Sequence, residues 1–295
     1  MKYSLKKNKF GFIQVKPTPS VEELDKFYKK NFYSINYKNF NNSELKEQVK
    51  DKKFYDYKWK RIFDNFKLLK KNFKNKKVLD IGCGWGQCLL YLQKKGFDCY
   101  GLDPSDKAIK YCKSKGLKAE ISNLEKLDIF GNIKFDFIIM NNVLEHLRDP
   151  ISIIKKVKYF LKKNGVLFIE VPNDFNSFQL TGKIVNKIKN NWWVSPPAHL
   201  NYFSHDTLNF FLKKSGFKIL KKDSSFPFEM FLLFGDNYVL KKTLGKECHK
   251  KRVNFEQNLL RDSNEKFLNL FYEKMAEINL GRTAIIYAKI KSKKN

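Results

Sequence analysis

The sequence lacks several features that would place it in a special class of protein. No run of 18 apolar residues occurs, so we expect no membrane-spanning helix. The first residues, 1–7, lack the apolar stretch of a secretory signal. The five cysteines include no CxxC pair, which argues against a disulfide framework and against a four-cysteine zinc site. The sequence therefore predicts a globular protein of a reducing, cytoplasmic compartment.

Arginine is scarce although the chain is strongly basic. There are 59 Lys and Arg residues against 30 Asp and Glu, a formal net charge of +29, yet only five of the 59 are Arg. Specific phosphate binding usually relies on Arg forks. The basicity therefore has two open interpretations. One is the codon bias of an AT-rich genome; the other is attraction to an anionic partner such as RNA, a phosphorylated sugar or a membrane surface.

Between residues 77 and 171, short apolar segments alternate with segments of helical periodicity. This pattern predicts strands at 77–81, 98–102, 118–122, 135–141 and 166–171, with helices at 86–95, 105–115 and 150–161. Such alternation is typical of a parallel sheet with helices on both faces. Ligands of these sheets bind at the carboxyl ends of the strands, so we expect the site there.

The rest of the chain is expected to form additions to this core. We predict an N-terminal helical cap or lid over 1–75, with 1–20 irregular and helices at 20–31 and 45–73. Aromatic residues cluster between Tyr28 and Tyr37, either as part of a lid or as packing within the cap. The core is expected at 76–225, a helical insertion at 226–282 with a helix at 256–280, and a last strand with a basic tail at 283–295.

The strongest local signal is the segment 78–86, Val-Leu-Asp-Ile-Gly-Cys-Gly-Trp-Gly. An apolar strand carries an acid near its end, Asp80, and three glycines follow at alternate positions before a helix. Glycines allow a sharp turn and let a ligand approach the backbone closely. A dinucleotide fingerprint would place a further glycine where Gln87 stands. Asp80 would also repel a pyrophosphate, so it suits a cationic group of a ligand.

The next predicted strand ends in Gly101-Leu-Asp-Pro-Ser105. An acid at the end of this strand is placed to accept both hydroxyls of a ribose, which assigns that role to Asp103. The two strand ends together predict a ligand with a ribose, a cationic group and no pyrophosphate. S-adenosylmethionine meets this description, since it contains an adenosine, a sulfonium and an α-ammonium.

Residues 78–171 resemble class I S-adenosylmethionine-dependent methyltransferases, in the small-molecule branch that includes ubiquinone and sugar methyltransferases. The glycine motif and Asp103 carry the resemblance, together with the segment 135–147 and its Leu-Glu-His, the segment 164–173 and, more weakly, the segment 199–204. The resemblance implies a Rossmann-like, seven-stranded, mostly parallel sheet and S-adenosylhomocysteine as product. It implies no metal, and these cofactor contacts: Asp80, Gly82, Cys83, Gly84, Gln87, Asp103, Pro104, Asn123, Leu124 and Asn141.

Some of these residues also have a purely structural interpretation. Cys83 fits a tight turn simply because it is small, and Asn123 and Leu124 fit an ordinary loop. Asn141 ends a strand, where a cofactor contact or packing is possible. His146 fits structure better than catalysis.

His199 is the candidate catalytic residue. It follows Pro196-Pro-Ala in a stiff loop, and a neutral imidazole there could take a proton from an acceptor hydroxyl. The alternative is a histidine that only ties down the loop. Trp192 and Trp193 either form the floor of an acceptor pocket or pack, and the position of Trp59 or Arg61 would let either reach the methionine end of the cofactor.

The expected activity is methyl transfer to a small molecule or saccharide, at a hydroxyl, in cell-surface polysaccharide or related biosynthesis. One alternative is an RNA methyltransferase, which the basic flanks favour. Another is a quinone-type lipid O-methyltransferase, for which the apolar segment 226–234 could lie at a membrane interface. The last is a non-catalytic binding subunit. Neither the acceptor nor the oligomeric state follows from the sequence.

Overall fold

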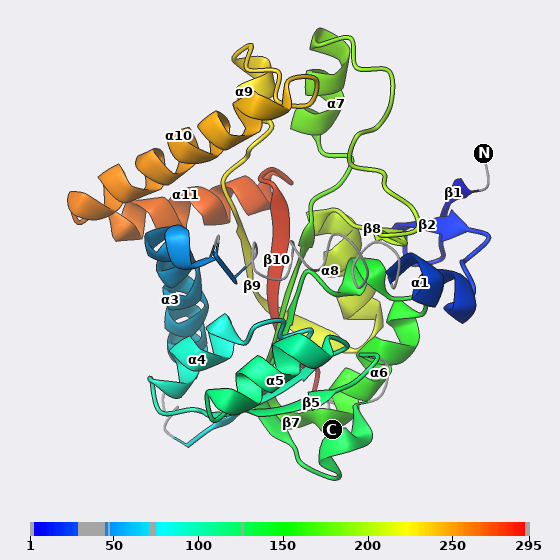
Figure 1. Cartoon of the computed structure of the whole chain (residues 1–295), viewed down its shortest axis with the longest axis vertical. Helices are drawn as coiled ribbons and strands as arrows, with labels where there is room; N and C mark the ends of the chain where they lie inside the picture. Colours follow the sequence, from blue (N-terminus) through cyan, green and yellow to red (C-terminus); the bar gives the residue numbers. More distant parts are fainter. Residues whose placement is uncertain (1–2, 29–44, 47, 71–74, 125–126, 293–295) are drawn as a thin grey trace.

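A computed structural model describes residues 3–28, 45–46, 48–70, 75–124 and 127–292 (Figure 1). A seven-stranded sheet in the order β5-β4-β3-β6-β7-β10-β9 lies at its centre. Its strands are β3 (Lys77–Ile81), β4 (Asp98–Asp103), β5 (Lys118–Ile121), β6 (Phe135–Asn141), β7 (Leu161–Pro172), β9 (Phe217–Ser224) and β10 (Thr283–Ile290).

The strand directions confirm the predicted Rossmann-like, mostly parallel sheet. Strands β3 to β7 pair in parallel, whereas β10 runs antiparallel to both β7 and β9. The five predicted strands of the core are all present. Strand β7 is longer than predicted, since it begins at Leu161 and not at residue 166.

Helices cover both faces of the sheet, as the alternation predicts. Successive strand residues face opposite sides, so Leu79 and Ile138 belong to one apolar core while Val78 and Phe137 belong to another. The core around Val78 is completed by α3 (Lys52–Leu69), α4 (Gln87–Gln93) and α5 (Asp106–Ser114). The opposite core is completed by α6 (Pro150–Phe160) and α8 (His205–Lys214).

Helix α3 is part of this core rather than of a separate cap. Phe66 stacks on Phe137 of β6, with ring centroids 4.3 Å apart. Arg61 reaches the far edge of the sheet, where it pairs with the buried Asp223 of β9. A helix was predicted over 45–73; the helix α3 that the structure describes spans Lys52–Leu69. The aromatic cluster between Tyr28 and Tyr37, for which a lid and packing within the cap were both open, lies, beyond residue 28, outside the described residues.

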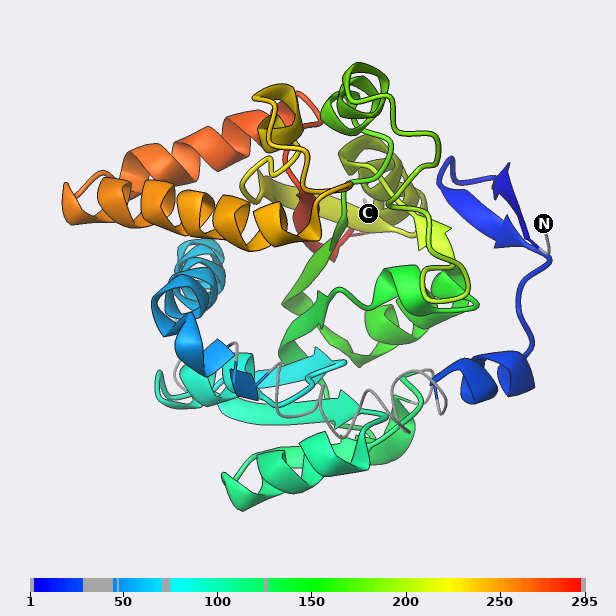
Figure 2. The same ribbon diagram turned by 45° about the horizontal axis from the view of Figure 1, so that its top comes forward.

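The N-terminal segment is not irregular, which corrects the prediction for residues 1–20. Strands β1 (Ser4–Lys7) and β2 (Ile13–Lys16) form a hairpin, and β2 pairs with β8 (Asn201–Tyr202) in a second, three-stranded sheet. The pairing partner lies almost 190 residues away, and for this reason local sequence patterns did not indicate it. Helix α1 (Val21–Tyr28) follows the hairpin, which lies beside the rest of the fold in Figure 2.

The insertion between β9 and β10 consists of α9 (Met230–Leu233), α10 (Lys242–Arg261) and α11 (Glu265–Glu277). The single helix predicted over 256–280 is wrong, because the chain reverses at Ser263, whose φ is 57°. Phe267 and Ile278, which follows α11, are 55% and 65% exposed, whereas Leu268 and Tyr272 are buried. Tyr272 packs with Tyr57 of α3, so a distant element selects the buried face.

Three shorter elements complete the fold. They are η2 (Asp128–Phe130), η3 (Leu144–His146) and α7 (Ser177–Val185). Across the described ranges, every helix is too short or too polar to cross a membrane.

Candidate active site

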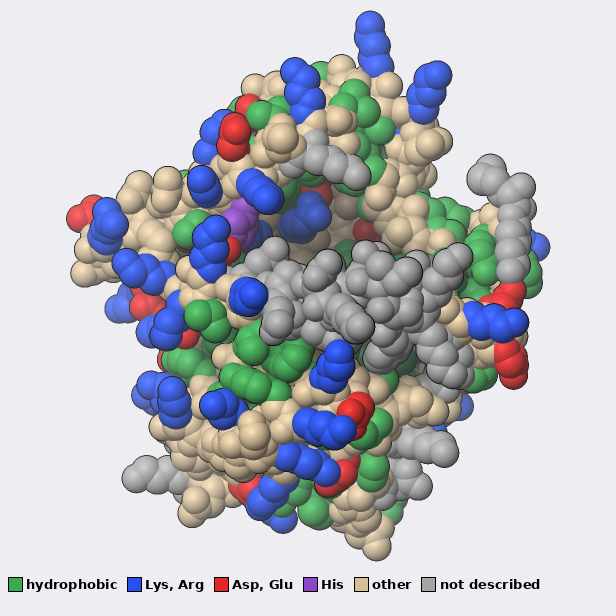
Figure 3. Space-filling view, in the orientation of Figure 1, with side chains coloured by type: hydrophobic (Ala, Val, Ile, Leu, Met, Phe, Trp, Pro, Cys, Tyr) green, Lys and Arg blue, Asp and Glu red, His purple; other side chains and the backbone are tan. Residues whose placement is uncertain are grey.

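A cavity of about 950 Å³ opens at the carboxyl ends of β3, β4 and β6, where the alternation predicts a ligand site. The space-filling view shows a hollow on this side of the molecule with acidic side chains in its depth (Figure 3). Residues from α1 and α3 line its outer wall. The lining includes every residue that the sequence assigns to cofactor binding: Asp80, Gly82, Cys83, Gly84, Gln87, Asp103, Pro104, Asn123, Leu124 and Asn141.

Asp80 lies near the end of β3 and is almost completely buried. Its Oδ1 atom has no hydrogen-bond partner within the described chain. Burial and, to a smaller extent, the Asp103 carboxylate raise the pKa of this carboxyl to about 8, while Lys58 opposes the shift. A buried carboxylate oxygen without a partner is costly, so this position favours a ligand that brings a cation or hydrogen-bond donor.

The glycine loop shapes the cavity floor in two different ways. A Cβ on Gly82 would lie 2.4 Å from Cγ2 of Val143, so no larger residue fits without a shift of the packing. A Cβ on Gly84 would meet nothing within 4 Å, although this glycine lines the cavity. The absence of side chains at Gly82 thus permits close packing, whereas at Gly84 it leaves space for a ligand beside the backbone.

Asp103 lies at the end of β4 and holds the glycine loop. Its Oδ2 accepts the Gly84 N–H at 2.9 Å and its Oδ1 accepts the Ser105 N–H at 2.8 Å. Burial raises the pKa of this carboxyl, although both backbone hydrogen bonds oppose the shift. Each carboxylate oxygen keeps a further lone pair that could accept a ligand hydroxyl.

Lys58 of α3 is a cavity residue that sequence reasoning missed. Its Nζ lies 3.1 Å from Oε2 of Glu170 on β7 and 3.4 Å from Oδ1 of Asn141 on β6. No local motif marks Lys58, because only the packing of α3 on the sheet brings it to the strand ends. Trp59 lines the cavity, whereas Arg61 is paired with Asp223 elsewhere and does not.

Some residues of the loops at the strand ends line the cavity, whereas others mainly pack within the fold. Leu124 has a φ of 64°, and it packs partly on the core and lines the cavity. Cys83 is buried, and its Sγ lies 3.8 Å from the Gly84 carbonyl oxygen. All five cysteines are free thiols. Trp193 is buried with Val15 and Tyr202, which favours packing over a pocket floor.

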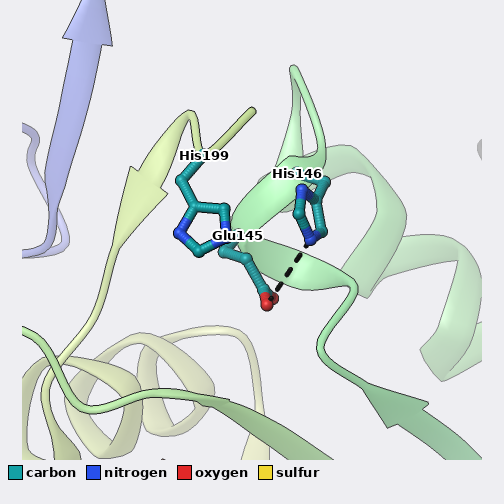
Figure 4. A group of neighbouring side chains, drawn as sticks. All are labelled: Glu145, His146 and His199. Atoms are coloured by element: carbon teal, nitrogen blue, oxygen red, sulfur yellow. Dashed lines mark ion pairs between the residues drawn. The ribbon is translucent and has the colours of Figure 1, made fainter. Parts of the chain in front are cut away.

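Of the two histidines His146 and His199, which the structure describes, only His146 lines the cavity. His199 lies next to His146. The two rings meet edge to face with centroids 4.9 Å apart, and the Glu145 carboxylate completes the group (Figure 4). Burial lowers the pKa of His199 to about 4 and also lowers the pKa of His146, while it raises the pKa of Glu145 well above its usual value. Both imidazoles are therefore neutral at neutral pH.

The sequence of this chain is similar to those of known methyltransferases. A family model for a methyltransferase domain matches residues 52–222, more than half of the chain. A ubiquinone biosynthesis O-methyltransferase of Actinobacillus pleuropneumoniae is 38% identical over 108 residues, which are 33% of this chain and 46% of that protein. A tRNA U34 carboxymethyltransferase of Campylobacter jejuni is 31% identical over 157 residues, 49% of this chain and 53% of that protein. The chain thus spans about half the length of the curated relatives it matches.

Solved structures share the fold at lower sequence identity. A SAM-dependent methyltransferase from Archaeoglobus fulgidus superposes with a TM-score of 0.53 at 20% identity, covering 83% of this chain and 99% of that one. The plantazolicin methyltransferase BamL, solved in complex with a triazolic desmethylPZN analog and SAH, gives a TM-score of 0.53 at 15% identity over 91% of this chain and 95% of that one. The chain therefore belongs to the methyltransferase domain family and has the fold of S-adenosylmethionine-dependent methyltransferases.

Proposed function

We propose that this protein transfers the methyl group of S-adenosylmethionine to a hydroxyl of a small-molecule or saccharide acceptor. The observation that carries the proposal is the buried Asp80 oxygen without a described partner, in one cavity with the open space at Gly84. Bound S-adenosylmethionine supplies a methyl group that is already activated on a sulfonium. The chain then has to orient the acceptor and exclude water, and such positioning is worth roughly 7–11 kcal/mol.

The proposed cofactor contacts follow from the chemistry of each side chain. Asp80 accepts the α-ammonium, which supplies the charge that its buried oxygen lacks. Asp103 accepts ribose hydroxyls while it holds the glycine loop. Asn123 and Leu124 contact the adenine edge, and Asn141 lies beside Lys58 near the methionine end. Cys83, Gln87 and Pro104 complete the wall.

The acceptor is proposed to lie on the His146 side of the cavity. Acceptor atoms lie there, because Nε2 of His146 has a free lone pair when Nδ1–H donates to the Ala198 carbonyl, and Glu145 has a buried oxygen without a partner in the described chain. Hydroxyl groups of a saccharide are donors that fit such a wall. The name of the A. pleuropneumoniae relative, an O-methyltransferase, supports oxygen as the methylated atom. We propose that His199, beside His146, acts on the acceptor hydroxyl, and that the free cysteines reflect a cytoplasmic setting.

The test is to incubate the protein with methyl-labelled S-adenosylmethionine and fractionated extract of the source cells. We expect label in the saccharide and small-molecule fraction, a loss of label with Asp80→Ala, and unchanged label with Asp206→Ala, which alters an exposed aspartate. His199→Ala should lower incorporation by about 10²–10⁴-fold if this residue assists removal of the proton. Label confined to another fraction would contradict the saccharide assignment.

A second candidate acceptor is RNA. Two observations favour it: the net charge of +29 and the C. jejuni relative, whose name describes a tRNA-modifying enzyme. Label in the RNA fraction, together with a steep loss of RNA affinity as salt rises, would support this alternative. Label in the lipid fraction would instead support a quinone-type acceptor. Cofactor binding without label in any fraction would support a non-catalytic binding subunit.

A further inference from the structure

Three side chains with metal-ligating atoms converge beside the cofactor cavity. Glu145 and His146 belong to η3, and His199 belongs to the loop before β8, yet their ligand atoms all lie within 4.8 Å of one another (Figure 4). We propose that Glu145, His146 and His199 bind one divalent transition-metal ion at the acceptor side of the cavity. The family resemblance led us to expect no metal, and the two segments that form the cluster lie more than fifty residues apart in the sequence.

The orientation of His146 is that of a ligand. The Nδ1–H donates to the Ala198 carbonyl oxygen at 2.7 Å, which fixes the tautomer and leaves Nε2 with a free lone pair. That lone pair faces Oε1 of Glu145 at 3.7 Å. A cation placed between these two atoms would be attracted by both of them. Metal-binding histidines typically donate their other N–H to a carbonyl in this way.

Two further polar atoms of the cluster have no protein partner in the described ranges. They are Oε2 of Glu145, a residue that is 1% exposed, and Nδ1 of His199. Buried polar atoms of this kind are rare, since each loses its hydrogen bonds with water. A bound cation would supply the missing interaction for both.

The backbone around the cluster is held in place by hydrogen bonds between its two segments. The Leu200 N–H donates to the Glu145 carbonyl at 2.8 Å. The buried Asn201 amide donates to the carbonyls of Leu144, at 3.2 Å, and Leu147, at 2.7 Å. The fold thus fixes the positions from which the three ligands extend, as a preformed metal site requires.

The donor set indicates the kind of ion. Two imidazole nitrogens and one carboxylate oxygen suit Zn²⁺ or another first-row divalent ion better than Ca²⁺ or Mg²⁺. Ligand atoms of a tetrahedral zinc site lie about 3.3 Å apart, so the side chains would close by about 1.5 Å at most. Three protein ligands leave a position open, and in an enzyme that position takes water or substrate.

The use of this ion rests on the proposed function. A hydroxyl of the acceptor in the open position would have a lower pKa and a fixed orientation. His199 would then act through the ion as a positioning residue, and not as a free base.

The test measures metal binding directly, without cofactor or acceptor. The full chain is stripped with a chelator and titrated with Zn²⁺, with metal content measured by mass spectrometry after dialysis. We expect one equivalent to bind, and affinity to fall by at least about 10–100-fold in His199→Ala and Glu145→Gln. His249→Ala is the control, because His249 is about as exposed as His146 but pairs with Asp51 outside the cluster. Circular dichroism verifies that each variant is folded.

Absence of a stoichiometric site in the folded protein would overturn the proposal. So would Zn²⁺ binding that His199→Ala and Glu145→Gln leave unchanged. Methyl transfer to a hydroxyl that persists in the metal-free protein would remove the ion from the reaction and leave the proposed function intact. Specific metal binding without any transfer to a hydroxyl acceptor would contradict the proposed function while the site itself stands.

Discussion

Asp80 shows how a single residue can be poor for stability and suited to binding. Its carboxyl is buried beside a second acid, Asp103, and one oxygen has no partner in the described structure. The folded protein therefore holds the proton of Asp80 more tightly than the unfolded chain does. This difference lowers the free energy of unfolding progressively as pH rises from about 4 to about 8. A ligand cation would reverse the effect.

We predict that Asp80→Asn stabilises the ligand-free protein and weakens cofactor binding. The gain in melting temperature should be larger at about pH 9 than at about pH 5, because the ionised carboxylate is the costly form. The affinity for S-adenosylmethionine should fall at both values. Thermal unfolding and calorimetric titration at the two pH values test this, with Asp206→Asn as the exposed control. Equal destabilisation at both values would contradict the account of Asp80.

At the scale of elements, the turn from β3 to α4 contains one glycine that is needed for packing and one that leaves space for a ligand. Gly82 and Gly84 both have positive φ, 78° and 50°, so alanine is strained at either position. They differ in their surroundings, since Val143 lies against Gly82 while Gly84 faces open space. The same residue type thus serves two purposes two positions apart.

We predict that Gly82→Ala and Gly84→Ala separate stability from affinity. Gly84→Ala should cost about 1–2 kcal/mol of unfolding free energy, which is the strain of a left-handed alanine. Gly84→Ala should weaken S-adenosylmethionine binding far more than Gly82→Ala does, because the added methyl at position 84 enters the cavity. Gly82→Ala should cost clearly more stability, because its methyl overlaps Val143. Urea unfolding and cofactor titration of both variants provide the measurement, and equal stability losses would refute the distinction.

At the scale of the whole molecule, the N-terminal segment ties distant parts of the fold together. Phe12 is fully buried in the main core, with its ring 4.4 Å from Phe203 and 5.4 Å from Phe211. Gln14 bonds the Asn201 side chain, and the Pro19 carbonyl accepts a hydrogen bond from Arg148. These contacts hold the segment against the two loops that carry Glu145, His146 and His199.

We predict that Phe12→Ala destabilises the whole domain and not only the hairpin. Loss of a fully buried phenylalanine costs about 3–5 kcal/mol, because transfer and cavity terms add. Leu5→Ala, at a 37% exposed position of the same hairpin, should cost little. Urea unfolding followed by far-UV circular dichroism compares the two variants. A Phe12→Ala protein as stable as Leu5→Ala would mean that the hairpin is only loosely attached.

Much of the core and of the cofactor cavity could be predicted because their signals are local. Strand alternation, the Asp80 motif and the acid after the next strand each lie within a few residues. Parallel strands then bring their carboxyl ends to one edge, so the predicted contacts meet in one cavity. The bounds of β7 and the break between α10 and α11 were missed, because partners elsewhere in the chain decide them.

The sequence by itself determined the parallel sheet, its glycine turn and the acids at its edge, since hydrophobic period and turn chemistry act over short distances. Only the tertiary structure decided which distant residues meet. It brought Lys58 to Glu170, β2 to β8 and His199 to His146. Such contacts depend on how whole elements pack, and no short-range pattern encodes packing across fifty or more residues.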